Sequence, residues 1–155
     1  MSGTVYSFDT SALIHAWRRA YRPKSFPTFW DRMDDLVAEG RLKISSEVYA
    51  ELAKKDDDVF SWCKERRDEI YVDIDDAVQD RVVEIMATHP RLVDTKNGKS
   101  GGDPFVIALA SCGLDISTVV TQEHPGGDRI PQVCDAEGIE WLNLVDFIER
   151  ESWVI

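Results

Sequence analysis

The sequence is poor in cysteine and contains no long hydrophobic run. Its three cysteines, Cys63, Cys112 and Cys134, form no CxxC pair and have no nearby histidine pair, which argues against a disulfide framework and against a zinc site. No apolar stretch approaches the roughly 20 residues that a membrane-spanning helix needs. The first residues, MSGTVYSFDT, lack the charged start and the apolar stretch of a signal peptide. These absences predict a cytoplasmic protein that does not enter a membrane.

Basic residues are also in short supply. The chain has 18 lysines and arginines against 29 aspartates and glutamates, which gives a net charge of −11. A nucleic-acid-binding protein is usually basic where it contacts phosphate, so the charge balance alone argues against such a function. Metal ions that neutralise part of the acidic set, or a basic partner that covers it, would reconcile the two.

Strand-like and helix-like hydrophobic spacing alternate along the chain, whose hydrophobic fraction of 43% is enough for a core. Strands are expected at residues 4–8, 42–44, 70–74, 117–120 and 139–142. Helices are expected at 10–20, 28–39, 59–67, 76–88, 103–113, 130–137 and 145–153, and a further one capped by Ser45 or Ser46. Because the connections are too long for hairpins, we expect a three-layer α/β/α sandwich with a central parallel sheet of four to five strands. No linker or repeat interrupts the pattern, which predicts one domain over residues 1–155.

Five acidic residues stand where such a sheet would gather them. Asp9 follows the first strand directly, and Glu123 closely follows the fourth. Asp103 opens the helix that precedes the fourth strand, whereas Glu47 and Glu51 are four residues apart and share one face of the helix after the second. Ligands of open parallel sheets bind at the carboxyl ends of the strands. We therefore expect three or four of these carboxylates to converge.

Carboxylate oxygens suit hard cations such as Mg²⁺ and Mn²⁺. Such an ion orients a phosphodiester, lowers the pKa of an attacking water and stabilises the leaving oxygen. Each acid also has a structural interpretation when taken singly. Asp103 before Pro104 and Asp9 before Thr10 are good helix caps, and the three glutamates suit exposed positions. Only the joint placement of the acids favours a metal site.

The segments VYSFDTSALI, ISSEVYAELA, GGDPFVIALASCG and STVVTQE, in this order and spacing, resemble the PIN-domain family. The best-known bacterial members of that family are the VapC-like toxins of toxin–antitoxin pairs. The resemblance covers about residues 5–144. It implies a parallel sheet with helices on both sides and a metal-dependent endoribonuclease, with Mg²⁺ or Mn²⁺ held by three or four acids. It also implies an RNA substrate, an antitoxin partner and the option of a homodimer.

Carried over to this sequence, the resemblance makes Asp9 the first acid, Glu51 the second and Asp103 the third. Glu47, one turn before Glu51, is a substitute or helper in metal binding. The family usually has aspartate at its fourth acid, in a T-x-D pattern, whereas this chain has Glu123 after Thr121 and Gln122. Supporting hydroxyl groups beside the acids are Thr10 and Thr121.

Basic and aromatic residues interleave just after the first acid. Trp17 and Tyr21 interleave with four basic residues: Arg18, Arg19, Arg22 and Lys24. Further basic residues stand near the other acids: Lys96, Lys99 and Arg129. We expect Arg18, Arg19, Arg22 and Lys99 to bind RNA, with phosphates neutralised by the basic groups and bases stacked on the aromatic rings. Two alternatives stay open. The arginines form a solvated helix face over a core tryptophan, or the same stretch docks an antitoxin or a second copy of the chain.

The leading prediction is a metal-dependent endoribonuclease that acts as the toxin of a toxin–antitoxin pair. A PIN-like module that binds RNA or protein without cutting is the main alternative, favoured by Glu123 and by the acidic net charge. A phosphotransfer domain of receiver or phosphatase type ranks lower, because Asp9 lacks a preceding acidic pair and is followed by Thr10 and Ser11 rather than by the D-x-D-x-T pattern.

Overall fold

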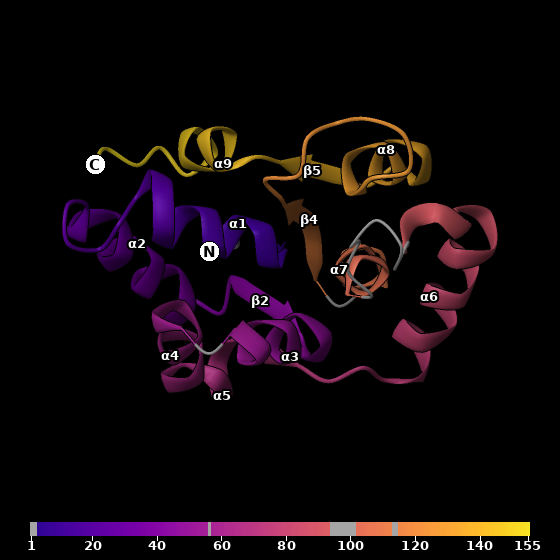
Figure 1. Ribbon diagram of the computed structural model, residues 1–155, viewed down its shortest axis with the longest axis horizontal. Coiled ribbons are helices and arrows are strands. Elements are labelled where there is room, and N and C mark those ends of the chain that lie inside the picture. Colours follow the sequence, from indigo (N-terminus) through magenta and orange to yellow (C-terminus); the bar gives the residue numbers. More distant parts are fainter. Residues whose placement is uncertain (1–2, 56, 94–101, 113–114) are drawn as a thin grey trace.

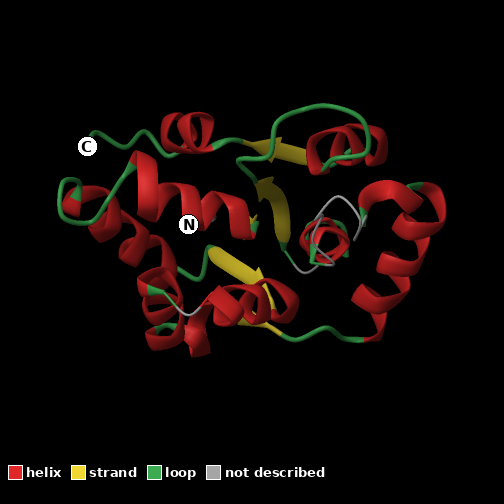
Figure 2. Ribbon diagram, viewed as in Figure 1, coloured by secondary structure: helices red, strands yellow, loops and turns green. Residues whose placement is uncertain are grey.

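Five short strands run parallel in one sheet in the computed structural model of the chain (Figures 1 and 2). The structure describes residues 3–55, 57–93, 102–112 and 115–155. The strands are β1 (Val5–Phe8), β2 (Leu42–Ser45), β3 (Tyr71–Val72), β4 (Ile116–Val120) and β5 (Glu140–Leu142). All four pairings between neighbouring strands are parallel. The α/β class and the parallel sheet expected from the sequence are confirmed.

The first strand lies at the centre of the sheet. The strand order is β3-β2-β1-β4-β5, with Tyr6 opposite Leu42 on one side and Ser7 opposite Val119 on the other. The chain therefore builds outward from β1 through β2 to β3 and then returns to add β4 and β5 on the other side. Connections reverse direction between β1 and β4. In open α/β sheets such a reversal opens a crevice at the carboxyl ends of the two strands.

Helices cover both faces of the sheet. Figure 1 shows α1 (Thr10–His15) and α2 (Pro27–Ala38) on one side and α7 (Asp103–Leu109) with α6 (Asp76–Thr88) on the other. The remaining helices are α3 (Ser46–Lys55), α4 (Asp58–Glu65), α5 (Arg67–Ile70), α8 (Ile130–Glu137) and α9 (Leu144–Arg150), with a 3₁₀ turn η2 (Pro90–Leu92). The three-layer sandwich is confirmed. Two helix-end signals are confirmed as well, because Ser45 Oγ accepts the N–H of Val48 and Gly40 follows α2 at a φ of 72°.

The core lies between the sheet and the helices. Tyr6 and Phe8 are fully buried on β1, and their rings meet the ring of Phe147 edge-on at 4.9 and 5.2 Å between centroids. Edge-to-face aromatic contacts add to the free energy of simple burial. The packing fixes β1, and with it the residue that follows the strand.

Three helices differ in extent from the sequence prediction. Residues 59–67 are divided at Arg66, whose guanidinium donates to the Trp62 carbonyl at 2.9 Å and so occupies an acceptor of the helix end. The helix expected at 103–113 ends at Leu109, because the Ser111 hydroxyl binds the carbonyl of Ala108 as the chain turns. Gly113, its expected cap, lies outside the described residues.

The last helix is shorter than the expected 145–153. It ends at Arg150 because Ser152 has a φ of 58° and the N–H of Trp153 binds the carbonyl of Ile148. This turn folds the Trp153 ring back onto Phe147 and Phe29. The C-terminal segment is thereby fixed against α2.

The first helix changes geometry half-way. After α1 the chain continues as a π-helix, η1 (Ala16–Ala20), closed by a hydrogen bond of 2.8 Å from the N–H of Tyr21 to the carbonyl of Ala16. Short π-helical segments are rare and occur often at functional sites.

No helix in the described part of the chain combines the length and the apolar character that a membrane crossing requires.

Candidate active site at the carboxyl edge of the sheet

The reversal between β1 and β4 places Asp9 beside the end of β4. The N–H of Asp9 donates to the carbonyl of Val120 at 3.0 Å, so the two strands remain paired until the first acid. Thr121, the next residue after β4, is fully buried. The first acid and the loop that carries Glu123 therefore meet at the crevice where ligands of this sheet class bind.

Hydroxyl groups from both strand ends hold the carboxylate of Asp9. Its Oδ2 atom accepts hydrogen bonds from Ser11 at 2.6 Å and from Thr121 at 2.7 Å. These hydroxyl oxygens in turn accept backbone N–H groups, that of Gln122 for Ser11 and that of Glu123 for Thr121, both at 3.1 Å. Asp9 occupies the N-cap position of α1 without making a side-chain cap bond. Asp9 therefore holds the N-cap position that its local pattern indicated, and hydrogen bonds from the backbone N–H groups of Thr10 and Ser11 oppose the rise in pKa that burial of its carboxyl causes.

Asp9 is 3% exposed. Burial raises the pKa of this carboxyl, and the hydrogen bonds from Ser11 and Thr121 act against that rise. A buried carboxylate without a cation carries a large desolvation cost. The position is consequently one where a bound cation would stabilise the protein.

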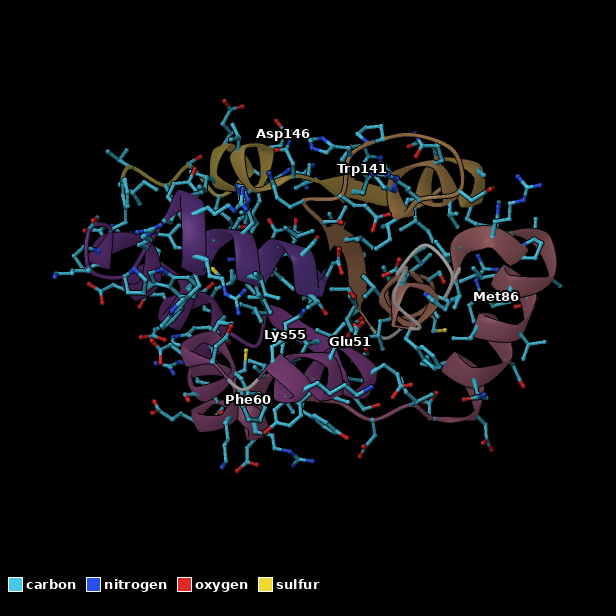
Figure 3. The ribbon with its side chains drawn as sticks, viewed as in Figure 1. Glu51, Lys55, Phe60, Met86, Trp141 and Asp146 are labelled. Atoms are coloured by element: carbon cyan, nitrogen blue, oxygen red, sulfur yellow. The ribbon has the colours of Figure 1, made fainter. Side chains whose placement is uncertain are left out.

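Glu51 on α3 is joined to the same place. Its Oε1 atom accepts a hydrogen bond of 2.9 Å from the hydroxyl of Thr10, the residue after Asp9. Burial raises the pKa of Glu51, and the negative charge of Asp9 raises it further, whereas the bond from Thr10 lowers it. Figure 3 shows Glu51 on the edge of α3 that faces the sheet and α7. Glu47, one turn earlier, is exposed, so of the two it is Glu51 that the structure joins to the segment carrying Asp9.

Asp103 is the other buried acid. It is 4% exposed and is the first residue of α7, whose N-cap is Gly102, so its predicted role as the cap residue is wrong. The Ser7 hydroxyl donates to the carbonyl of Val106 at 2.8 Å, which fixes α7 beside β1. Helix α7 leads back to the start of β4 and so runs against the strands. Asp103 thus opens a helix that the Ser7 hydroxyl fixes beside β1.

Glu123 has a defined structural contact. Its Oε1 atom accepts the N–H of Ile130 at 2.9 Å, which caps the first turn of α8 from outside the helix. Burial raises the pKa of the neighbouring Cys134 thiol to about 12, and the charges of Asp135, Asp9 and Glu123 add to that rise. Asp9 and Glu123 thus both act on this thiol, from the two strand ends.

The basic residues are placed differently. Arg18 forms an ion pair with Asp57, and Arg19 and Arg22 are exposed. They lie on η1 and just beyond it, and Figure 1 shows the α1–η1 run leading away from the carboxyl edge of the sheet. Lys96 and Lys99 lie outside the described residues. Arg129 is exposed and immediately precedes α8. It is therefore next in sequence to Ile130, whose N–H binds Glu123.

Ser11 is a site residue that the sequence prediction did not assign. The structure makes it a partner of Asp9 and of the loop after β4. The hydroxyl pair in the run DTS was visible in the sequence. The sequence did not reveal which acid each hydroxyl binds: Thr10 donates to Glu51, and Ser11 donates to Asp9.

The acids lie at one edge without forming a closed set of ligands. Within residues 3–55, 57–93, 102–112 and 115–155, no three His, Cys, Asp or Glu side chains stand together as a metal site. Like charges keep carboxylates apart until a cation neutralises them. Oδ2 of Asp9 and Oε1 of Glu51 are held by hydroxyl groups, and the second oxygen of each has no side-chain donor in the described structure.

A family model extends over almost the whole chain. The model of DUF4411, described as a domain of unknown function, matches residues 6–155. The chain belongs to the DUF4411 family. No curated protein matches this DUF4411 chain.

Among solved structures, the DUF4411 chain is similar to one from the crystal structure of VapBC2 from Rickettsia felis bound to a DNA fragment from their promoter. The likeness has a TM-score of 0.54 at 14% identity and covers 90% of this chain and 98% of the other. Identity this low establishes a shared fold only. The fold of this chain is therefore PIN-like, as the resemblance in the sequence implied.

Proposed function

We propose that this protein is a metal-dependent endoribonuclease that hydrolyses RNA phosphodiester bonds and acts as the toxin of a toxin–antitoxin pair. One observation carries the proposal. Among the described residues, the only buried carboxylates are Asp9 and Asp103, and Asp9 directly follows the last residue of β1. Glu51, hydrogen-bonded to Thr10, adds a third acid beside them. Burial of two carboxylates is costly, and a functional cation would account for that cost.

The donor set fits a hard divalent cation. All the groups concerned are carboxylates and hydroxyls, which favour Mg²⁺ or Mn²⁺ over softer metals. Oδ1 of Asp9 and Oε2 of Glu51 have no side-chain donor among the described residues and are the atoms that would bind, together with the carboxylate of Asp103. Glu47 and Glu123 would contribute through water or a side-chain rotation.

Three hydroxyl side chains orient the carboxylates of Asp9 and Glu51. Ser11 and Thr121 fix the orientation of Asp9 by binding one of its two oxygens, and Thr10 does the same for Glu51. When bound, the cation would polarise the scissile phosphate and lower the pKa of the attacking water. Arg129, exposed at the start of α8, is placed to contact a phosphate of the substrate beside this edge.

The toxin role and the antitoxin partner are supported by the fold alone. The similar solved structure is of VapBC2 bound to promoter DNA, and a protein of the same fold is a reasonable candidate for the same kind of pair. Induced expression of this chain in bacteria should arrest growth. Asp103→Asn should relieve the arrest at equal protein level, and normal growth with folded, metal-binding wild type would argue against the toxin role.

A PIN-like module that binds RNA or protein without cutting is the second candidate. Glu123 favours it, because its carboxylate is already occupied by the N–H of Ile130. The binding module is also favoured because no three His, Cys, Asp or Glu side chains of the described residues are grouped as a metal site. This candidate predicts that Asp103→Asn leaves function nearly unchanged.

A cleavage assay separates the two candidates. Wild type, Asp9→Asn and Asp103→Asn would be incubated with structured and single-stranded RNA in Mg²⁺, in Mn²⁺ and in EDTA. The exposed Asp80→Asn on α6 is a matched control that removes one carboxylate far from β1. We expect cleavage only with metal, loss of at least about 100-fold in the two site variants, and no change in the control. Folded wild type that cuts no RNA under any condition would leave the binding module as the better candidate.

A further inference from the structure

The segment between Asp9 and Asp31 contains no acidic residue, although the chain has 29 of them. It carries four basic residues within seven positions: Arg18, Arg19, Arg22 and Lys24. This separation of charge is unusual in a chain of net charge −11. A concentrated positive surface on an acidic protein attracts an acidic partner over a distance and suppresses wrong partners.

The basic segment is held in a defined shape. The π-helix η1 ends at Tyr21, whose carbonyl accepts the indole N–H of Trp30 at 2.6 Å. The Tyr21 ring stacks on Phe29 at 4.6 Å with an interplanar angle of 12°, and Phe26 meets Tyr21 edge-on at 5.6 Å. Because these rings fix the backbone, the neighbouring charges are presented by a preorganised surface. Preorganisation lowers the entropy cost of binding.

Most of the charge in this segment is available. Arg18 is engaged by Asp57, but Arg19, Arg22 and Lys24 are exposed and make no ion pair within the described structure. Phe26 is 39% exposed beside them. Beyond the buried Phe29 lies Trp153, which is followed by Val154, 88% exposed. Positive charge and exposed apolar side chains thus occur together.

We propose that Arg19, Tyr21, Arg22, Lys24 and Phe26 form a docking patch for an acidic, amphipathic segment of a partner protein. The partner's glutamates or aspartates would meet the three basic groups, and its apolar side chains would cover Phe26. The proposal concerns binding only and does not depend on nuclease activity.

RNA fits this docking patch less well. The helical rise carries Arg19 about 13 Å along the α1–η1 run from Thr10, away from the acids. The face of the Tyr21 ring is covered by Phe29, so it offers no platform for a base.

The test measures fluorescence anisotropy of a labelled helical peptide of about 18 residues, with leucines along one face and glutamates along the other. The protein is full-length Asp103→Asn in EDTA, so RNA cleavage plays no part. Arg19→Glu with Arg22→Glu should weaken binding by at least about tenfold, and Phe26→Ser by a similar factor. Arg32→Glu, an exposed charge reversal on α2, should leave binding unchanged. A peptide with serine in place of leucine should bind weakly.

Four results would overturn the docking proposal. The first is an acidic peptide that binds no better than its serine version, and the second is binding that survives charge reversal. A single-stranded RNA oligonucleotide that binds tightly, and loses binding on the same two reversals, would assign the patch to RNA instead. Self-association of the protein that the reversals abolish, seen by size-exclusion chromatography, would assign it to a second copy. Circular dichroism of each variant confirms that the fold is retained.

Discussion

The Thr10 hydroxyl donates a hydrogen bond of 2.9 Å to Oε1 of Glu51 and so links the start of α1 to α3. Thr10 directly follows Asp9, so the bond ties the second acid to the backbone that carries the first. Thr10 is buried and Glu51 is half-buried, which makes the geometry more rigid than that of a surface contact. Loss of a hydrogen bond that orients a metal ligand typically lowers metal affinity or activity by about 10- to 100-fold.

Replacement of Thr10 by valine keeps the shape of the side chain and removes the hydroxyl. We expect Thr10→Val to raise the apparent dissociation constant for Mn²⁺ by about tenfold or more and to lower RNA cleavage accordingly. Thr10→Ser keeps the donor and should stay close to wild type. Isothermal titration calorimetry with Mn²⁺ measures the affinity. Equal affinity in Thr10→Val and wild type would show that Glu51 does not need this bond.

Asp9→Asn is expected to improve stability while it removes activity. Burial raises the pKa of Asp9, because ionisation of this carboxyl costs the folded protein free energy when no metal is bound. The neutral asparagine avoids that cost, and its amide oxygen still accepts the hydroxyls of Ser11 and Thr121. In EDTA at pH 7, we expect Asp9→Asn to gain about 1 kcal/mol, or about 2–4 °C in Tm.

The stability difference between wild type and Asp9→Asn should depend on pH. Because the folded pKa of Asp9 lies above its unfolded value, the folded state binds more protons in the interval between the two. The stability contributed by the protonated form is complete below the unfolded pKa and is lost as pH rises through the folded pKa. Wild type in EDTA should therefore lose stability over that interval relative to Asp9→Asn. Added Mg²⁺ should restore Tm in wild type only, and equal restoration in the variant would place the cation elsewhere.

Ser11 and Thr121 bind the same oxygen of Asp9, so their contributions should be coupled. Either hydroxyl alone still fixes Oδ2, whereas loss of both frees the carboxylate to rotate. We expect Ser11→Ala and Thr121→Val each to weaken Mn²⁺ binding by less than about tenfold, and the double variant to weaken it by about 100-fold. A double-mutant cycle on Mn²⁺ affinity measures the coupling. Additive effects would mean that the two hydroxyls hold Asp9 independently.

The sequence allowed the elements and the sheet class to be predicted because hydrophobic spacing and end signals are local. Ser45 as a cap and Gly40 as a helix end follow from backbone chemistry within a few residues. The strand order was not predicted, since nothing local specifies that β4 returns to pair with β1. Helix ends failed where a side chain intervened, as with Arg66 and Ser111.

The candidate site shows the same division. Asp9 and Asp103 are both buried, and that they share a site stays a prediction. Their local pattern favoured helix caps, and Asp9 does stand at the N-cap of α1, whereas Gly102 is the N-cap of α7. Whether Glu47 or Glu51 faces the site depends on how α3 is rotated against α1, which is a matter of tertiary packing. The partner of Arg18 could not be foreseen either, because Asp57 lies 39 residues away in sequence.

Glu123 is the acid whose two roles can be separated by substitution. Its carboxylate caps α8 through the N–H of Ile130, and its charge, like that of Asp9, raises the pKa of the Cys134 thiol. Glu123→Gln keeps an acceptor for the N–H and removes the charge, whereas Glu123→Ala removes both. We expect Glu123→Gln to keep the wild-type Tm and to lose about tenfold in cleavage, since a charged group near the cation strengthens its binding. Glu123→Ala should also lose about 1 kcal/mol of stability, as helix-cap deletions do. Thermal melts in EDTA and cleavage rates in Mn²⁺ measure the two effects separately. Full activity in Glu123→Gln would restrict Glu123 to its capping role and leave Asp9, Glu51 and Asp103 as the metal-binding acids.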